Sequence, residues 1–433
     1  MTLKIAIVGS GPSGFYTANA LLKACEDCRI DILDRLPTPF GLIRGGVAPD
    51  HAKTKNVTRA YTKTAEHPSV RYFGNVEMGR DVSVAELKDM YDAVVLTIGS
   101  PLDRPLGIPG DDKQGVIGAA AFVGWYNAHP DFTDLAPKLD TKAVAVVGNG
   151  NVAIDIARVL VKTPAEMAAT DIAAYAARAI HASPLAHVYM FGRRGPVEAK
   201  FTNVELREMG ELEDCAPVVD ANQLPDTVEG DFSDRDRRLK ERNLETLRSF
   251  VPMKDLAKSK RVHFAFFANP VEVLGAERVE GLRLERTQVQ GGRAVGTGET
   301  FDIACGLVLP AIGYRAEPMD GLPIDVKAGI VTNADGHVED NLYAAGWIKR
   351  GPTGTIGTNK HDGDSAATRI LAEITPSGRP GRDALEPLLA ERGVRAINFD
   401  DWKKIDAAEV AAAEAGAPRA KFATIPEMLA CLD

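Results

Sequence analysis

Residues 4–22 read KIAIVGSGPSGFYTANALL and decide the fold of the first part of the chain. A short apolar run ends at glycines and a helical pattern follows, which is the strand–turn–helix context of a dinucleotide-binding fingerprint. Gly9 permits the tight turn, Gly11 lets a pyrophosphate approach the backbone, and Gly14 permits close packing of helix on strand. The positive end of the helix would face the phosphates. We therefore expect a parallel α/β unit that binds a dinucleotide.

A second apolar run, residues 29–33, ends at Asp34. Asp34 lies 20 residues after Gly14, where an acid in this fingerprint binds the ribose hydroxyls. The glycine triplet alone is weak evidence, because a tight strand–helix turn without a ligand has the same pattern. The triplet, its context and the spaced acid together favour a dinucleotide site.

The same pattern returns at residues 143–160, which read AVAVVGNGNVAIDIARVL. Gly148, Gly150 and Ala153 take the three small positions. A predicted strand at 187–191 then runs into Arg193 and Arg194, which stand where an NAD site carries an acid. Guanidinium groups suit a 2′-phosphate, so this unit should prefer NADP over NAD, although an exposed charge pair would look the same. The long spacing before the arginines is attributed to an Ala-rich helical stretch at about 162–182.

Two further apolar runs end in glycine, at 93–99 and 306–313, and they bound the second fingerprint. This predicts that the second nucleotide unit is inserted into the first. The expected fold is α/β with two Rossmann-like domains: residues 1–104 and 318–433 form the outer domain, and 105–317 form the inserted one. Residues 290–298 indicate a hairpin turn. Residues 341–345 indicate a buried strand, and about 362–374 a helix after a glycine-rich loop.

Composition excludes several classes of function. The chain has 433 residues, with 51 Lys and Arg against 60 Asp and Glu, and a formal net charge of −9, which tells against nucleic acid as a partner. No apolar run reaches about 18 residues, so we expect no membrane span. We expect no signal peptide, because the strand-like run from Leu3 to Val8 begins at once. Five cysteines are sparse and odd in number, which suits the cytoplasm.

Four segments give the chain a resemblance to a known family. They are Gly9 to Phe15; PFGLIRGGVAPDH at 39–51; GRRGP at 192–196 continuing to FTNVELRE at 201–208; and GWIKRGPTGTI at 346–356. Each is long, and together they resemble the adrenodoxin reductase type of ferredoxin–NADP+ reductase, including its bacterial members. The resemblance covers about residues 3–370 and implies FAD in the outer domain and NADP(H) in the inserted one.

The resemblance also implies cofactor-binding residues. Those for FAD, beside the first fingerprint, are Ser13, Asp34, Leu42, Val76, Trp347, Gly354, Thr355 and Ile356. Those for NADP(H) are Arg104, Asn149, Gly150, Asn151, Val152, Arg193, Arg194 and Glu205. Two positions depart from the family: Asp34 stands where Glu is usual, and Gly45 where a larger residue is usual. Trp347 could cover the flavin ring or be a core aromatic.

Hydride transfer between these cofactors requires positioning groups rather than a nucleophile. His51 lies in a family segment that the resemblance places near the flavin, where it could orient the nicotinamide or relay a proton. Glu205 and Glu208 lie three apart on a predicted helix, so they share a face and either could bind the carboxamide. Asp155 is a weaker candidate for a proton path or a contact between domains. No metal site is predicted.

The predicted activity is electron transfer between NADPH and a small iron–sulfur protein such as ferredoxin. An NADPH-oxidising subunit of a larger enzyme, a flavin disulfide reductase using Cys25 and Cys28, and an NADPH sensor are the alternatives. The cysteine pair follows the far end of the first helix, about 20 Å from the pyrophosphate end, which disfavours the disulfide reductase. A basic helical run could bind the acidic ferredoxin or be a solvated face; it comprises Arg235, Arg237, Arg238, Lys240 and Arg242.

Overall fold

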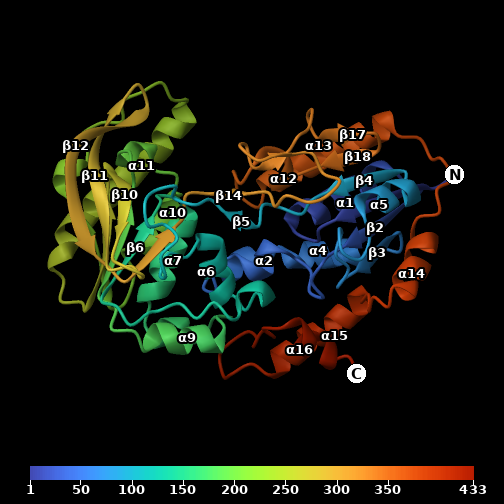
Figure 1. Cartoon of the computed structure of the whole chain (residues 1–433), viewed down its shortest axis with the longest axis horizontal. Coiled ribbons are helices and arrows are strands. Elements are labelled where there is room, and N and C mark those ends of the chain that lie inside the picture. The colour runs from blue at the N-terminus through green and yellow to red at the C-terminus, as the bar shows by residue number, and fades with distance from the viewer.

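The computed structural model describes residues 1–433 and contains two parallel sheets that lie side by side (Figure 1). The first sheet has the strand order β17-β18-β4-β1-β2-β3, and the second has the order β13-β6-β7-β9-β8. Every neighbouring pair in both sheets is parallel except β17 with β18. Parallel neighbours need crossover connections, and helices supply many of them. The predicted α/β fold with two Rossmann-like sheets is confirmed.

The strands of the two sheets are short. In the first sheet they are β1 (Leu3–Val8), β2 (Cys28–Leu33), β3 (Val70–Phe73), β4 (Ala93–Leu96), β17 (His337–Glu339) and β18 (Leu342–Ala344). In the second they are β6 (Ala143–Val147), β7 (His187–Phe191), β8 (Cys215–Val219), β9 (Lys260–Ala265) and β13 (Leu307–Pro310). A separate antiparallel sheet contains β10 (Ala268–Leu274), β11 (Gly281–Gln290) and β12 (Arg293–Ala304). Two small ladders remain: β5 (Leu102–Asp103) with β14 (Tyr314–Arg315), and β15 (Ile324–Asp325) with β16 (Ile330–Val331).

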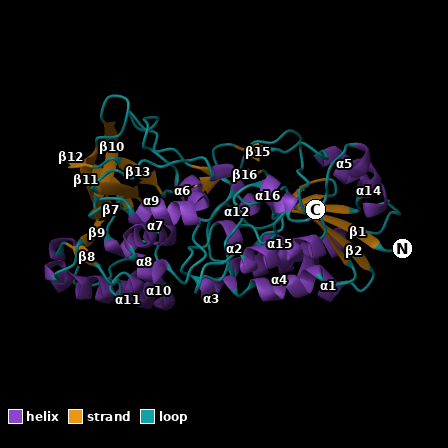
Figure 2. Cartoon of the chain, turned by 90° about the horizontal axis from the view of Figure 1, so that it is seen from below, coloured by secondary structure: helices purple, strands orange, loops and turns teal.

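The helices fall into two groups by the sheet that they accompany (Figure 2). Those of the first group are α1 (Pro12–Ala24), α2 (Leu42–Gly45), α3 (Ala52–Lys55), α4 (Thr58–Ala65), α5 (Val84–Met90), α12 (Trp347–Arg350), α13 (Thr358–Glu373), α14 (Arg382–Glu391), α15 (Phe399–Ala411) and α16 (Ile425–Ala430). Those of the second are α6 (Ala119–Tyr126), α7 (Asn151–Val161), α8 (Pro164–Met167), α9 (Ala174–His181), α10 (Asn203–Glu208) and α11 (Asp234–Phe250). No helix combines the length and the hydropathy that a membrane crossing requires.

Alternation along the central strands explains why both faces of each sheet are covered. In β1, Ile5 and Ile7 belong to one buried cluster, whereas Ala6 and Val8 belong to another. In β6, alternate residues likewise divide between two clusters. Successive side chains of a strand point to opposite faces, so a run that is apolar throughout must be buried on both.

The second sheet is built from residues between β4 and β18 of the first, as the glycine-ended runs predict. The chain leaves the first sheet through β5 and returns through β14. These two strands pair antiparallel, with Tyr314 opposite Asp103 and Arg315 opposite Leu102. The exact domain limits at 104/105 and 317/318 stay a prediction; they lie close to these two strands.

The Ala-rich stretch at 162–182 is not one helix, and that prediction is wrong. Thr163 and Glu166 form a capping box that starts α8, which ends after one turn. Thr170 Oγ1 then donates to the carbonyl oxygen of Met167 at 2.8 Å, which gives the backbone an alternative to the helical ladder. The chain resumes helix only at α9. The helix predicted from 362 also begins earlier, at Thr358, whereas the hairpin turn falls at Gly291–Gly292 as expected.

The C-terminal segment contacts both halves of the molecule. In Figure 1 it runs beneath them as the red chain that carries α15 and α16. Lys421 is buried and lies 3.1 Å from Asp171 and from Asn127 Oδ1, both in the second half, and it donates to the Arg44 carbonyl in the first. Burial lowers the pKa of Lys421 to about 7, with Lys55 adding to that shift. The segment therefore ties the loop around α2 to the inserted half.

Candidate active site

The first glycine cradle forms between β1 and α1. Gly9 has φ +108°, and a Cβ on Gly14 would lie 2.1 Å from the Gly9 carbonyl oxygen, so neither position tolerates a side chain. A Cβ on Gly11 would meet only the Gly41 Cα at 3.9 Å. Gly11 is also the N-cap of α1 and supplies no side chain to the first N–H groups of the helix. Those donors are left for a ligand, as a pyrophosphate site requires.

Asp34 follows β2 and faces this cradle, but its oxygens already have partners in the protein. Oδ2 accepts from the Ser10 N–H at 2.9 Å and from the Ser10 hydroxyl at 2.5 Å. Oδ1 accepts from the Leu36 N–H at 3.0 Å. Oδ1 accepts only this one bond and has a second lone pair, so the short side chain can still accept from a ribose hydroxyl. The structure thus places Asp34 at the end of the turn and shows that it also stabilises the turn.

The remaining residues predicted to bind FAD differ in which of their groups are available to a ligand. Ser13 Oγ donates to Asn359 Oδ1 at 3.0 Å, and a Cβ on Gly346 would lie 1.9 Å from Ser13 Oγ, so α1, the turn after β18 and α13 meet there. Leu42 is 48% exposed and free to cover a ligand, whereas Val76 is 1% exposed and can offer only its backbone. Trp347 stacks on Tyr314, with ring centroids 5.8 Å apart and ring planes inclined by 29°. Residues 354–356 lead into α13, whose N-cap Gly357 also makes no side-chain cap.

The second cradle repeats this design between β6 and α7. Gly148 has φ +147°, and a Cβ there would lie 2.4 Å from the Ala311 carbonyl oxygen. Gly150, the uncapped N-cap of α7, has nothing within 4 Å of an added Cβ. Asn149 Oδ1 is buried without a partner. Asn151 Oδ1 accepts from the Thr202 N–H at 2.8 Å, and Val152 is partly buried against the core. The donors and open space fit a second dinucleotide.

The arginines after β7 have no carboxylate partner. Arg193 is exposed, and Arg194 makes one long contact, 3.4 Å, to the Gly292 carbonyl. Their loop is fixed through its backbone, because Thr287 Oγ1 donates to the Arg193 carbonyl at 2.8 Å and the Phe267 N–H to that of Arg194. Free guanidinium groups on a fixed loop suit a phosphate. Arg104, the other arginine predicted to bind NADP(H), differs from Arg193 and Arg194 because its guanidinium already has partners. It donates to the carbonyls of Tyr314 and Ala328 at 3.0 and 2.8 Å.

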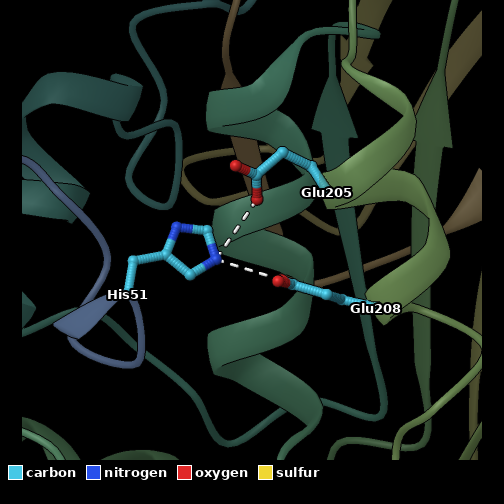
Figure 3. Close-up of side chains that lie close together, drawn as sticks. All are labelled: His51, Glu205 and Glu208. Atoms are coloured by element: carbon cyan, nitrogen blue, oxygen red, sulfur yellow. Dashed lines mark hydrogen bonds and ion pairs between the residues drawn. The ribbon is translucent and has the colours of Figure 1, made fainter. Parts of the chain in front are cut away.

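The two halves meet at His51 (Figure 3). Its side chain extends from the loop before α3 toward Glu205 and Glu208 on α10. His51 Nε2 lies 3.0 Å from Glu208 Oε2 and 3.2 Å from Glu205 Oε2. His51 Nδ1 lies 3.9 Å from Asp155 Oδ1 on α7. The structure therefore brings together the predicted catalytic residues, His51, Glu208 and Asp155, with the NADP(H) candidate Glu205.

Burial and hydrogen bonding set the charges of this cluster. Burial lowers the pKa of His51, but the hydrogen bond to Glu208 and the charges of Asp155 and Glu205 together outweigh burial, and the net pKa lies above the usual value. The same hydrogen bond lowers the pKa of Glu208. Burial raises the pKa of Glu205 and of Asp155. These shifts favour a shared proton between His51 and its carboxylates.

Sequence reasoning missed two residues of this cluster, Asp50 and Arg158. Arg158 is fully buried, and Asp50 binds it through both carboxylate oxygens at 2.6 and 3.0 Å. An arginine within the mostly apolar α7, on a helix whose other charge is Asp155, is the signal that could have found it. The guanidinium also decides against a metal ion. Ligand-type atoms of His51, Glu205 and Glu208 lie within 4.8 Å of one another, but the Arg158 nitrogens lie 2.7–3.5 Å from them and supply the positive charge.

Cys25 and Cys28 lie where the sequence predicts, after the far end of α1. Both are free thiols, and Cys28 Sγ donates to the Cys25 carbonyl at 3.3 Å. Burial and the neighbouring Cys25 raise the pKa of Cys28 to about 12. A thiolate is the reactive species in disulfide exchange, so this environment opposes a redox-active pair.

Two glycine cradles on two parallel sheets, joined by a polar cluster, define a pyridine-nucleotide oxidoreductase, and comparisons agree. Residues 3–190 match the family model described as pyridine nucleotide-disulphide oxidoreductase. The chain is 42% identical over 454 residues to the mitochondrial NADPH:adrenodoxin oxidoreductase of Mus musculus, covering 100% of this chain and 92% of the relative. It is 40% identical over 447 residues to the NADPH-ferredoxin reductase FprA of Mycobacterium tuberculosis, covering 98% of each.

A solved structure of that FprA, described as being in complex with NADPH, matches with a TM-score of 0.94 at 39% identity, with 100% of both chains covered. The chain belongs to the family of adrenodoxin reductases and FprA-type NADPH-ferredoxin reductases. The resemblance drawn from the four sequence segments is confirmed.

Proposed function

We propose that this protein is an FAD-dependent NADPH-ferredoxin reductase, which takes electrons from NADPH and passes them to a small iron–sulfur protein. The family relationship supports this reaction, since its members named above are NADPH-ferredoxin and NADPH:adrenodoxin oxidoreductases. FAD supplies the chemistry when bound, because it accepts two electrons as a hydride and releases them singly. The site residues would bind the two cofactors, orient them toward each other and exclude water from between them.

One observation carries the proposal: His51, from the half with the first cradle, contacts Glu208, from the half with the second. We infer that ligands of the two cradles would meet at this contact. We assign FAD to the first cradle, with Gly9, Gly11, Ser13, Gly14, Asp34 and residues 354–356. We assign NADPH to the second, with residues 149–152, Arg193 and Arg194, and the carboxamide to Glu205. His51 and Glu208 would then orient the nicotinamide and hold the proton described above.

The test follows NADPH and flavin in separate steps. The purified protein should carry FAD, and anaerobic NADPH should bleach its absorbance with a much lower Michaelis constant than NADH. A small ferredoxin from the source organism should then increase NADPH-dependent reduction of cytochrome c. Protein without flavin, or flavin that NADPH does not reduce, would contradict the proposal. We place the reaction in the cytoplasm, supported by the five free thiols.

Replacing Arg193 and Arg194 together by Ala is expected to raise the Michaelis constant for NADPH by about a hundredfold or more. Each charge-assisted bond to a phosphate is worth about 1.5–3 kcal/mol, and 1.4 kcal/mol is a factor of ten. The constant for NADH should change little, because NADH has no 2′-phosphate. Steady-state kinetics with both coenzymes measures this. An equal loss with both would remove the 2′-phosphate assignment.

The docking surface for ferredoxin is proposed to lie on α11, and the structure corrects its composition. Arg237 donates to the Gly230 carbonyl at 2.9 Å and also to that of Val228, and Lys240 to that of Val197, so two of the five basic residues already bind within the protein. Arg235, Arg238 and Arg242 are exposed. These three remain to meet an acidic partner.

Reversing Arg238 and Arg242 to Glu should therefore slow ferredoxin reduction about tenfold or more at low salt, with little change in dye reduction. Electrostatic steering accounts for the loss, so it should shrink as salt rises. The control reverses Lys23 and Lys63 to Glu; both are exposed, on α1 and α4, and give the same change in net charge. Equal slowing in both double variants would place docking elsewhere.

A further inference from the structure

Arg158 is the most deeply buried charge in the cluster between the two halves. Its side chain has no exposed area, and all five polar partners carry or can carry a charge. Nε and Nη2 donate to Asp50, and Nη2 also donates to Asp155 Oδ1 at 2.8 Å. Nη1 lies 3.5 Å from Glu205 Oε2 and 3.4 Å from Glu208 Oε2. A buried guanidinium needs such partners, because desolvation alone would be strongly unfavourable.

The decisive contact joins Arg158 to His51. Nη2 lies 2.7 Å from His51 Nε2, the same nitrogen that lies 3.0 Å from Glu208 Oε2. A guanidinium can only donate, whereas an ionised carboxylate can only accept. Nη2 has two hydrogens for three neighbouring acceptors, so its bond to His51 shares or replaces one of the bonds to Asp50 and Asp155. His51 Nε2 can therefore accept from Arg158 when it has no proton, or donate to Glu208 when it has one, but it cannot do both. With Nε2 unprotonated, the ring proton is on Nδ1, which faces Asp155 at 3.9 Å.

We propose that Arg158 is a positioning residue that controls His51: it keeps the unprotonated form of Nε2 accessible by donating to it in competition with Glu208. Without that donor, His51 would stay protonated and bound to its carboxylates. With it, the ring can give up and regain a proton at Nε2. The inference rests on the proposed function, because the consequence of this exchange is read from NADPH-dependent flavin reduction.

The charges around His51 and Arg158 agree with this role. They come from the loop before α3, from α7 and α10, and from two tyrosines packed against them: Asp50, Asp155, Lys162, Glu205, Glu208, Tyr126 and Tyr314. Four carboxylates thus face two basic side chains, Arg158 and Lys162, and the excess of carboxylates favours a proton on His51. The positive charge of Arg158 acts in the opposite direction and lowers the pKa of His51.

Asp50 makes the arrangement testable in both directions. It holds Arg158 through two hydrogen bonds and also accepts from Lys162 at 2.8 Å. It precedes His51 in the chain, so the same ion pair fixes the loop that carries the imidazole to α7. Neutralising Asp50 removes a negative charge and leaves Arg158 freer to bind His51, which should lower the pKa of His51. Removing the Arg158 charge should raise it.

The experiment measures the rate of flavin reduction by NADPH as a function of pH, by anaerobic stopped flow, in the holoenzyme. The Arg158→Met variant should move the inflection of the profile upward by about one pH unit or more. A like charge within a few ångströms lowers the pKa of a cationic group on this scale, and the variant removes that charge. The Arg158→Lys variant keeps the charge and should return the inflection most of the way to that of the wild type. The Asp50→Asn variant should move it downward.

Flavin content and thermal melting are measured in parallel, since a merely structural residue would change those and leave the inflection in place. A wild-type profile without an inflection, or an unshifted one in Arg158→Met that retains flavin, overturns the proposal. If Arg158→Met does not fold, the pH profiles of Arg158→Lys and Asp50→Asn test the proposal instead. Matching, unshifted profiles in these two would overturn the inference, while wild-type flavin reduction by NADPH would still support the proposed function.

Discussion

Protein carrying Gly14→Ala is expected to purify with little or no flavin and to melt at a lower temperature than the wild type. The added Cβ would lie 2.1 Å from the Gly9 carbonyl oxygen, which is backbone and cannot turn aside. Either α1 moves away from β1 or the turn opens, and overpacking of this kind costs about 1–3 kcal/mol, occasionally more. Both movements displace the N–H groups that we assign to the pyrophosphate of FAD.

The matched control is Gly150→Ala in the second cradle. A Cβ there has no atom within 4 Å, and Gly150 has φ −119°, which any residue adopts. This variant should keep its flavin and lose no more than about 1 kcal/mol of stability, the usual scale of an N-cap change. Its Michaelis constant for NADPH should rise, because the methyl group would occupy the space assigned to the coenzyme. The ratio of flavin to protein absorbance and thermal melting measure the difference. If Gly14→Ala retained its flavin, the predicted loss of FAD from the first cradle would be refuted.

Variants Glu208→Gln and His51→Ala are expected to slow flavin reduction by NADPH about a hundredfold while FAD stays bound. Positioned proton-transfer and hydrogen-bonding groups commonly contribute factors of this size. Glutamine keeps the shape of Glu208 but removes the charge that holds the proton on His51. Stopped-flow reduction measures the rate directly, before any step that involves ferredoxin.

Glu211→Gln makes the same chemical change three residues further along the chain and serves as the control. Glu211 is exposed, and only its backbone contacts Glu208. Its reduction rate should match the wild type. Normal rates in both site variants would show that His51 and Glu208 bridge the two halves without acting on the coenzyme.

The fold was predictable from sequence because its decisive features are local. The two cradles depend on small residues at fixed offsets after apolar strands, and such patterns can be read without tertiary information. The prediction of one helix in the Ala-rich stretch failed because it depended on helix propensity alone. Helix propensity is a weak preference, and where the predicted helix is interrupted the Thr170 hydroxyl is bound to the Met167 carbonyl.

The site was predictable only in part. The resemblance drew attention to His51, Glu205 and Glu208, but nothing in the sequence states that residues 51 and 208 touch. Arg158 and Asp50 are 108 positions apart, and their ion pair exists only because α7 packs against the loop before α3. The basic run shows the same limit, since the carbonyls that bind Arg237 and Lys240 belong to segments outside α11.

The pairing of β5 with β14 has a consequence for engineering. The chain enters and leaves the inserted half at one place, with Asp103 opposite Tyr314 in a two-residue ladder. A segment whose ends are neighbours can be replaced by a related one without stretching its host. The coenzyme-binding half should therefore be exchangeable as a cassette between family members, provided that the graft keeps Asp171 and Asn127 for Lys421 and Arg158 for Asp50.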